Sequence, residues 1–246
     1  MTGSPTRAPI ARLGWDSDFF GFPIARVDAT QLDKQAIDAA VEACGAQGIR
    51  CAYLLLAADD ARGGAIAQAA GFVLRDVRLT FARPLDHGPA AGLAAAAHGS
   101  IAPARAAQRP ALEALARDAF AHTRFLSDPG FPPDRARELY AAFVRRGLDD
   151  APRRVTLADS ATEGFVVCRL DADAGVGEIE LIAVAPAARG RGLGRALVDA
   201  ALAMFADAGL PRASVATQAA NVASQRLYQR SGFRTSEAGL WFHRWF

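Results

Sequence analysis

The chain has 246 residues, which is long enough for one large domain or two modest ones. Its formal net charge of +2 is too small to predict a nucleic-acid partner. Its three cysteines have no metal-ligand spacing, and their odd, sparse count argues against disulfides, so no metal site is expected. Because no stretch approaches the roughly 20 apolar residues of a membrane span, and because Met1–Pro9 is not a signal or transit peptide of the usual form, we expect a cytoplasmic protein without a membrane partner.

Residues 1–88 predict a small N-terminal αβ unit. Its expected elements are, in chain order, strands at Ala11–Trp15 and Ile24–Asp28 around the turn Asp16–Pro23, a helix at Lys34–Gln47, a strand at Cys51–Leu56, a helix at Asp60–Ala70 and a strand at Phe72–Ala82. The following residues are rich in Gly, Ala and Pro and have almost no periodic hydrophobic signal. We interpret residues 89–100 as a linker.

Residues 101–246 predict a second, larger domain with the element order β-α-α-β-β-β-α-β-α-β-β. The expected elements before the central strand are a strand near Ile101–Ala106, a helix at Gln108–Phe120, a loop at His122–Pro133, a helix at Asp134–Gly147 and strands at Arg154–Leu157 and Glu163–Asp171. After it come a helix that ends at Gly209, a strand at Arg212–Thr217, a helix from Asn221 and a closing strand at Ser236–Phe246. This order is typical of an α/β (α+β) fold with a mixed central sheet flanked by helices.

A glycine-rich loop follows the apolar strand that ends at Val184. Pro186 has no N–H for a strand ladder, and apolar residues at helical spacing begin at Leu193. Three glycines and three arginines alternate between them: Arg189, Gly190, Arg191, Gly192, Gly194 and Arg195. Free N–H groups at the start of the helix, together with the arginine charges, predict a phosphate or pyrophosphate site. An ordinary strand-to-helix connection is the alternative, and the interleaved arginines disfavour it.

A second motif lies in residues 221–233. Asn221 is a favourable residue at the start of a helix, and Asn221, Ser224 and Tyr228 share one helix face because they are three and four residues apart. Gly232 suits the left-handed conformation that ends a helix. A similar helix, Gly-Phe and strand occur at residues 67–81, so the N-terminal unit has the pattern of a partial copy of the C-terminal half. Chance similarity is the alternative to such a repeat.

Arg189-x-x-Gly192-x-Gly194 after a strand resembles the acetyl-CoA loop of the GNAT N-acetyltransferases, and residues 221–233 resemble the second signature of that family. The resemblance covers roughly residues 101–246 and implies the GNAT acyl-CoA N-acyltransferase fold, with the N-terminal unit resembling a partial GNAT half. It also implies an enzyme that transfers acetyl from acetyl-CoA to a primary amine. Residues 13–21 and the pair Arg124-Phe125 resemble the TDP-fucosamine (TDP-4-amino-4,6-dideoxygalactose) N-acetyltransferase group, which implies a nucleotide-linked amino sugar, a TDP-sugar, as the small-molecule acceptor.

In this family the loop amides hold the CoA pyrophosphate, and the central strand pairs with the pantetheine arm where two parallel strands splay apart. The cofactor-binding residues implied by the resemblance are therefore Ile182, Ala183, Val184, Arg189, Gly190, Arg191, Gly192, Leu193, Gly194, Arg195, Asn221 and Ser224. Plain helix capping is an alternative role for Asn221.

The resemblance also implies catalytic roles. Tyr228 matches the general acid that protonates the leaving thiolate, and packing of its ring under the pantetheine is the alternative. Glu178 and Glu180 are expected on one face of the central strand, together with Ile182, because side chains alternate. A carboxylate there takes the amine proton through water in many members, and a surface ion pair is the alternative.

The acceptor site is expected at the loop that contains His122, Arg124 and Phe125. Arg124 suits a diphosphate and Phe125 suits stacking, whereas a solvated loop and a core aromatic are the alternatives. Other acceptors for a GNAT enzyme are a protein N-terminus, a polyamine or another small amine, and a non-catalytic acyl-CoA-binding module is a different class of function. The aromatic C-terminal strand allows pairing between chains, which leaves a homodimer open.

Overall fold

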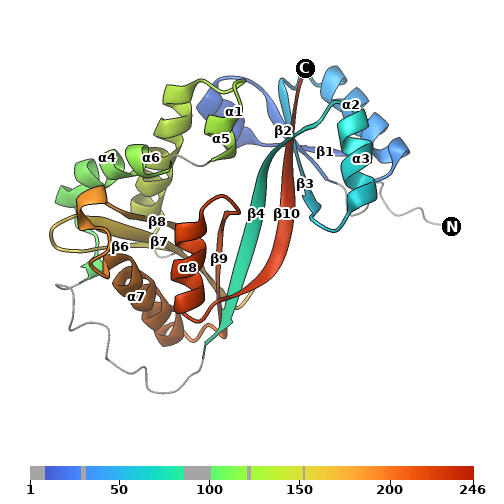
Figure 1. The fold of residues 1–246 in the computed structure, drawn as a ribbon. Helices are drawn as coiled ribbons and strands as arrows, with labels where there is room; N and C mark the ends of the chain where they lie inside the picture. Colours follow the sequence, from blue (N-terminus) through green and yellow to red (C-terminus); the bar gives the residue numbers. More distant parts are fainter. Residues whose placement is uncertain (1–8, 29–31, 86–100, 121–122, 152) are drawn as a thin grey trace. The chain divides into compact units, whose positions relative to one another are not determined.

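The computed structural model describes residues 9–28, 32–85, 101–120, 123–151 and 153–246 (Figure 1). The chain divides into two compact units. Unit 1 contains Met1–Arg78, Ser127–Pro132 and Ala238–Phe246, and unit 2 contains Leu79–Leu126 and Pro133–Glu237. The linker expected at residues 89–100 lies outside the described residues, so the boundary between two sequential domains stays a prediction.

Unit 1 has a mixed sheet in the order β1-β2-β3-β10-β4. Strand β2 runs parallel to β3 and antiparallel to β1, and β10 runs antiparallel to β3. Its core contains Ile37, Leu54, Phe72 and Phe242. The elements of this unit are β1 (Ile10–Arg12), α1 (Gly14–Phe20), β2 (Ile24–Val27), α2 (Lys34–Ala46), β3 (Cys51–Ala57), α3 (Ala61–Ala69) and parts of β4 (Val73–Pro84) and β10 (Arg234–Trp245).

The prediction of a turn at residues 16–23 was wrong in its first part, because residues 14–20 form α1. The buried Ser17 stabilises this short helix by bonding to the residues before and after it. Its hydroxyl donates to the carbonyl of Leu13 at 2.6 Å and accepts from the N–H of Ile24 at 2.9 Å. Gly21, with φ +81°, ends the helix in the left-handed region. These bonds join residues up to seven positions apart, and the apolar pattern alone does not reveal them.

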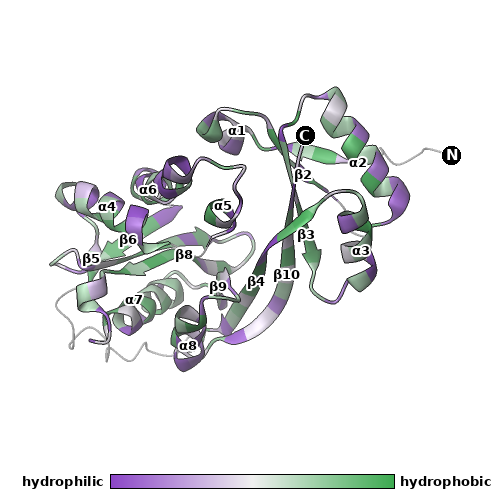
Figure 2. Cartoon of the chain, turned by 45° about the horizontal axis from the view of Figure 1, so that its top comes forward, coloured by the Kyte–Doolittle hydropathy of each residue, from purple (hydrophilic) through white to green (hydrophobic). Residues whose placement is uncertain are grey.

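Unit 2 has the sheet order β5-β6-β7-β8-β9-β4-β10, and α6 and α7 pack on opposite faces of this sheet (Figure 1). Gly177 of β8 lies against Phe205 of α7, and Gly147 of α6 lies against Val167 of β7. Figure 2 shows hydrophobic residues along β8 and hydrophilic ones along α6. The elements are β5 (Ala102–Pro103), η1 (Ala106–Gln108), α4 (Arg109–Ala119), α5 (Arg124–Ser127), α6 (Pro133–Asp149), β6 (Arg154–Ala158), β7 (Gly164–Asp171), β8 (Val176–Val184), η2 (Pro186–Ala188), α7 (Leu193–Asp207), β9 (Arg212–Gln218) and α8 (Val222–Arg230).

The mixed sheet flanked by helices confirms the predicted fold class. Two details differ. One strand of 12 residues, β10, follows α8, where two strands were predicted, and a helical turn, α5, occupies part of the predicted loop. Strand β10 is not broken because residues 234–245 contain only one glycine and no proline.

Strands β4 and β10 each contribute residues to both units (Figure 1). In unit 1 the strand β10 lies between β3 and β4, and in unit 2 the strand β4 lies between β9 and β10. Each half of the chain therefore completes its sheet with a strand from the other half. Neither half of the sequence contains all the strands of its own unit.

Candidate active site

The parallel strands β8 and β9 pair over only part of their length. Their register runs from Val176 opposite Arg212 to Ile179 opposite Val215. Strand β8 then continues to Val184, and β9 continues to Gln218. Beyond Ile179 this pairing between β8 and β9 ends, and the expected splay lies beside Ile182–Val184. Backbone N–H and C=O groups at such an edge can pair with an extended ligand.

A β-bulge lies at the start of the splay. On β7, Val167 pairs with Leu181 and the next residue, Cys168, pairs with Ile179, so Glu180 is the extra residue. The bulge shifts the alternation of side chains along β8. Ile182 therefore packs with Ile179 against the core under α7, and the prediction that Ile182 shares the face of Glu178 and Glu180 was wrong.

The loop before α7 has the backbone expected of an anion site. Gly190 and Gly192 have φ values of +75° and +85°, which side chains other than glycine rarely adopt. Gly192 is the N-cap of α7, and no side chain caps this helix. The first N–H groups of the 15-residue helix therefore have no side-chain acceptor, and they lie at the positive end of the helix dipole.

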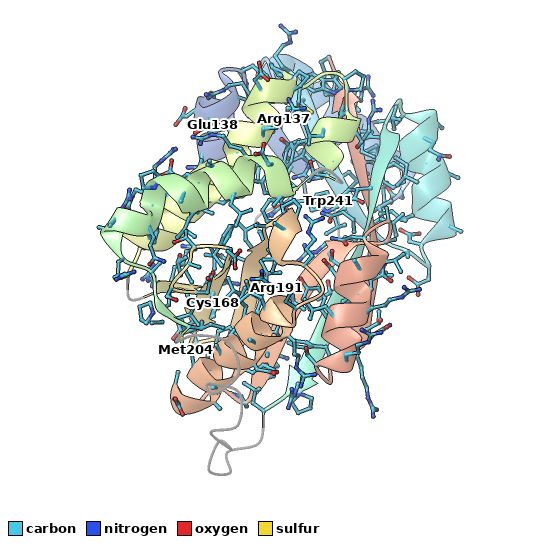
Figure 3. All side chains as sticks on the ribbon, turned by 60° about the vertical axis from the view of Figure 1, so that its left-hand side comes forward. Arg137, Glu138, Cys168, Arg191, Met204 and Trp241 are labelled. Carbon is cyan, nitrogen blue, oxygen red and sulfur yellow. The ribbon has the colours of Figure 1, made fainter. Side chains whose placement is uncertain are left out.

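The three loop arginines are exposed and lie around this helix end. Figure 3 labels Arg191, whose guanidinium donates to Glu163 at 2.6 Å. Arg195 donates to Asp199 at 2.7 Å and to the carbonyl of Arg230 at 2.7 Å. Arg189 donates to the carbonyl of Val184 at 3.2 Å, which is a backbone group expected to hold the cofactor arm. A pyrophosphate thus fits the donor set, because uncapped amides and guanidinium groups are its usual ligands.

The helix between the parallel strands β2 and β3 of unit 1 lacks these features. Helix α2 begins after Asp33, whose carboxylate accepts from the N–H of Ala36 at 2.8 Å. This carboxylate already satisfies the helix end and would repel a phosphate. The structure therefore agrees with the absence of an arginine-glycine loop from the N-terminal sequence.

Helix α8 brings together the three residues of the second motif. The Asn221 side chain accepts from the N–H of Ser224 at 3.2 Å, so its capping role is present. Tyr228 is buried, and its hydroxyl forms a hydrogen bond with Ser224. Burial raises the pKa of the Tyr228 phenol above its ordinary value, and the hydrogen bond from Ser224 opposes the increase. The phenol therefore keeps its proton at neutral pH.

A residue that the sequence reasoning missed lies under Tyr228. Phe81 of β4 is fully buried, and its ring centroid is 5.9 Å from that of Tyr228. Phe233 contacts the same ring with a centroid distance of 6.1 Å. Phe81 is 147 positions before Tyr228, and only the placement of β4 beside β9 in unit 2 brings them together.

Both candidate carboxylates are ion-paired with arginines. Glu180 binds Arg154 at 2.7 and 2.9 Å and lies 3.5 Å from Arg169. Glu178 binds Arg169. The sequence reasoning named an ion pair as the alternative to a catalytic base, and the structure contains that pair for both residues. The carboxylate oxygens that a base would offer to a water molecule are thus already in contact with guanidinium groups.

Two of the three residues expected to bind the acceptor lie in the described part of the chain. Phe125 is buried in unit 2, and the guanidinium carbon of Arg124 lies 4.2 Å from its ring centroid. His122 lies outside the described residues. Within the described part of the chain, no group of three His, Cys, Asp or Glu side chains is placed to hold a metal ion, and no helix is long and apolar enough to cross a membrane.

Comparison with known proteins identifies the family. A family model described as "Acetyltransferase (GNAT) family" matches residues 113–233. The dTDP-fucosamine acetyltransferase of Escherichia coli O6:H1 is 30% identical over 244 residues, which is 98% of this chain and 100% of that protein. The chain belongs to the GNAT acetyltransferase family.

Two further matches show how far this GNAT chain resembles other members. A mycothiol acetyltransferase of Streptomyces avermitilis is 34% identical over 110 residues, which is 41% of this chain and 36% of that protein. A GCN5-related N-acetyltransferase from Sphaerobacter thermophilus has the same fold, with a TM-score of 0.65, 14% identity, and coverage of 96% of this chain and 76% of that one. The predicted GNAT fold and acyltransferase class are confirmed.

Proposed function

We propose that this GNAT enzyme transfers acetyl from acetyl-CoA to the amino group of a nucleotide-linked amino sugar, such as a TDP-sugar. The observation that carries the proposal is the end-to-end match to dTDP-fucosamine acetyltransferase, which includes the N-terminal unit. The match to mycothiol acetyltransferase covers only 110 residues. A match that extends beyond the acetyltransferase motifs favours a shared acceptor as well as a shared chemistry.

The chain offers two sets of groups to the cofactor. The open backbone of Ile182–Val184 suits the extended pantetheine arm, and the amides at residues 191–195 suit the pyrophosphate. Arg189, Arg191 and Arg195 add positive charge at the entrance. Bound acetyl-CoA supplies the acetyl thioester. Arg189 must release the carbonyl of Val184 for that group to pair with the arm.

Tyr228 is the proposed general acid. Burial keeps its hydroxyl protonated, and Ser224 orients that hydroxyl from one turn earlier on α8. The phenol donates its proton to the leaving thiolate as the carbon–sulfur bond breaks. Asn221 fixes the start of the helix that carries both residues.

Glu180 and Glu178 are proposed to accept the amine proton through water. Each is paired with an arginine, so the proton transfer takes place beside a cation. A strong base is unnecessary for a 4-amino sugar, since its amine has a lower pKa than an alkyl amine. Arg124 is proposed to bind the diphosphate of the acceptor, and Phe125 supports the arginine from the core.

The test is acetylation by the purified full-length protein. Thiol release is measured with acetyl-CoA and TDP-4-amino-4,6-dideoxygalactose, in parallel with glucosamine, spermidine and a peptide with a free N-terminus. We expect turnover with the TDP-sugar at least 100 times that with the other amines. Faster turnover of spermidine or the peptide would contradict the amino-sugar proposal.

The variant Tyr228→Phe tests the acid. We expect thiol release to fall by about 10²- to 10⁴-fold, the usual contribution of an acid or base, while calorimetry shows unchanged binding of acetyl-CoA. The matched control is Tyr140→Phe, whose ring stacks on Phe120 of the same unit and should keep its full rate. Binding of acetyl-CoA without turnover of any amine would instead indicate an acyl-CoA-binding module.

A further inference from the structure

A turn in unit 2 holds one residue in a strained backbone conformation. The turn comprises residues 159–163 and joins β6 to β7. Thr162 has a φ of +60°, and among the described residues it is the only one other than glycine with a positive φ. A β-branched residue is disfavoured in this left-handed region. Such a conformation persists only where the surrounding contacts hold it, and it is found most often at functional sites.

Buried hydrogen bonds hold the turn. The carboxylate of Asp159 accepts from the N–H of Ala161 at 2.9 Å and from that of Gly164 at 2.7 Å. The buried side-chain amide of Gln108, from η1, donates to the carbonyl of Asp159 at 2.9 Å and to the hydroxyl of Thr162 at 3.0 Å. These bonds oppose the strain at Thr162, and they fix the direction of the residue that follows it.

That residue, Glu163, contacts the proposed pyrophosphate loop at both ends. Its carbonyl accepts from the N–H of Ala185, the first residue after β8, at 2.7 Å. Its carboxylate accepts from the guanidinium of Arg191 at 2.6 Å. A Cβ on the next residue, Gly164, would lie 3.0 Å from the side chain of Leu193, the first residue of α7. The turn and the start of β7 therefore contact the loop where it begins and where it ends.

The ion pair of Glu163 and Arg191 is not explained by the stability of the fold. The two side chains are 35% and 60% exposed, and ion pairs exposed to solvent contribute little to stability. A guanidinium group has more N–H donors than one carboxylate contact uses. The contact with Glu163 therefore orients Arg191 and still leaves donors for a phosphate group.

We propose that Glu163 is a positioning residue for the pyrophosphate of acetyl-CoA, and that Thr162 and Gln108 hold it in place. This deepens the proposed function and rests on it, because it takes the loop before α7 as the cofactor site. The carboxylate orients Arg191, and the carbonyl fixes the start of the loop. Without the carboxylate, Arg191 loses its orientation, so binding of the pyrophosphate weakens while the chemical step is unchanged.

The test is calorimetric binding of CoA to full-length Glu163→Ala. The dissociation constant should rise by about tenfold, which corresponds to about 1.4 kcal/mol and is the order of one hydrogen bond to a charged group. At saturating acetyl-CoA, kcat should stay within about twofold of the wild-type value. S-acetylpantetheine has the arm and no pyrophosphate, so its KM should be the same for the variant and the wild type.

The matched control is Asp199→Ala. Asp199 also pairs with a loop arginine, Arg195, at 2.7 Å, but it does so from one turn further along α7. Both variants remove one negative charge beside the loop, so a general electrostatic effect would be the same in both. Asp199→Ala should not weaken CoA binding. Equal weakening in the two variants would overturn the proposal, and so would tighter binding by Glu163→Ala, since the carboxylate would then compete with the pyrophosphate.

The variant Thr162→Gly separates positioning from folding. Glycine adopts a positive φ without strain, which offsets the loss of the bond from Gln108, so the urea midpoint should stay close to that of wild type. CoA binding should nevertheless weaken at least threefold. Unchanged CoA binding by Glu163→Ala would overturn this inference alone. Failure of wild type to bind CoA would overturn the proposed function as well.

Discussion

Phe81 links the N-terminal half of the chain to the proposed acid, and Phe81→Ala measures that link. The side chain is fully buried in the core of unit 2, against the ring of Tyr228. Replacing a buried phenylalanine with alanine costs about 3–5 kcal/mol, from the lost burial and the cavity left behind. Since domains are stable by about 5–15 kcal/mol in total, the variant should remain folded with a large loss of stability.

The matched control is Phe72→Ala. Phe72 is equally buried, but it lies in the core of unit 1, one residue after Gly71. Urea unfolding should show a similar loss of unfolding free energy for both variants. The rate of thiol release, measured at a temperature where both variants are folded, should then differ between them. The reason is that Phe81 contacts the ring of Tyr228 whereas Phe72 lies in the core of unit 1. A displacement of about 1 Å at a reacting group can lower a rate by about 100-fold, and we expect kcat of Phe81→Ala to be at least tenfold below that of Phe72→Ala.

Two results would refute this reasoning. A loss of less than about 1 kcal/mol for Phe81→Ala would show that β4 is not part of the core that surrounds Tyr228. Equal kcat values for the two variants, at equal losses of stability, would show that Phe81 contributes to folding alone. The second result would leave the N-terminal half without a role in the acid step.

Three further predictions follow from the same contacts. Gly192→Ala should weaken acetyl-CoA binding, measured by calorimetry, by at least tenfold, because φ there is +85°. The control Gly64→Ala, in α3 of unit 1, should bind normally, because its added Cβ would meet nothing within 4 Å. Asp128 should make the protein acid-sensitive. Burial would raise its pKa, but hydrogen bonds from His243, Gly130 and Trp245 outweigh burial and lower the pKa from 3.8 to about 2 in the folded protein, so about 2 kcal/mol of stability is present above pH 4 and lost as the pH falls towards 2. Urea unfolding of wild type should give a lower unfolding free energy at pH 2.5 than at pH 5. The difference between the two pH values should be smaller for Asp128→Asn, which has no carboxyl at this position. Glu180→Gln should lower kcat/KM by less than tenfold, since the carboxylate is already paired with Arg154 at 2.7 Å; a loss above 100-fold in the steady-state rate would show that Glu180 is the main base.

The parts predicted well from the sequence are those set by neighbouring residues. Helix α2 runs from Lys34 to Ala46, against the predicted Lys34–Gln47, and Asp33 caps it as its side-chain chemistry requires. The loop glycines have the positive φ values that their spacing suggested. Asn221, Ser224 and Tyr228 share a helix because three- and four-residue spacing fixes a face.

The parts that could not be predicted depend on residues far apart in the sequence. The bulge at Glu180 arises from pairing with β7, and alternation within β8 alone gives the wrong face for Ile182. His243 had no partner pattern in the sequence, because its partner, Asp128, is 115 positions away. The arginine partners of Glu178 and Glu180 likewise come from neighbouring strands. No local pattern contains this information, since cross-strand contacts depend on the sheet order.

The two helix–Gly–Phe segments show why the N-terminal half is more than an attached unit. Gly71 and Gly232 have φ values of +82° and +83°. Phe72 and Phe233 each donate an N–H at 3.0 Å to the residue five positions earlier.

In each segment, an arginine side chain donates to a carbonyl at the end of the helix. That arginine belongs to the strand that follows the helix of the other segment. Arg83 of β4 donates to the carbonyl of Ser231, and Arg244 of β10 donates to that of Ala70. The helix that carries Tyr228 is thus completed by β4, which follows the helix of the N-terminal segment. A half that lacks the phosphate loop can still be required for activity, because it supplies a strand of the acetyltransferase core.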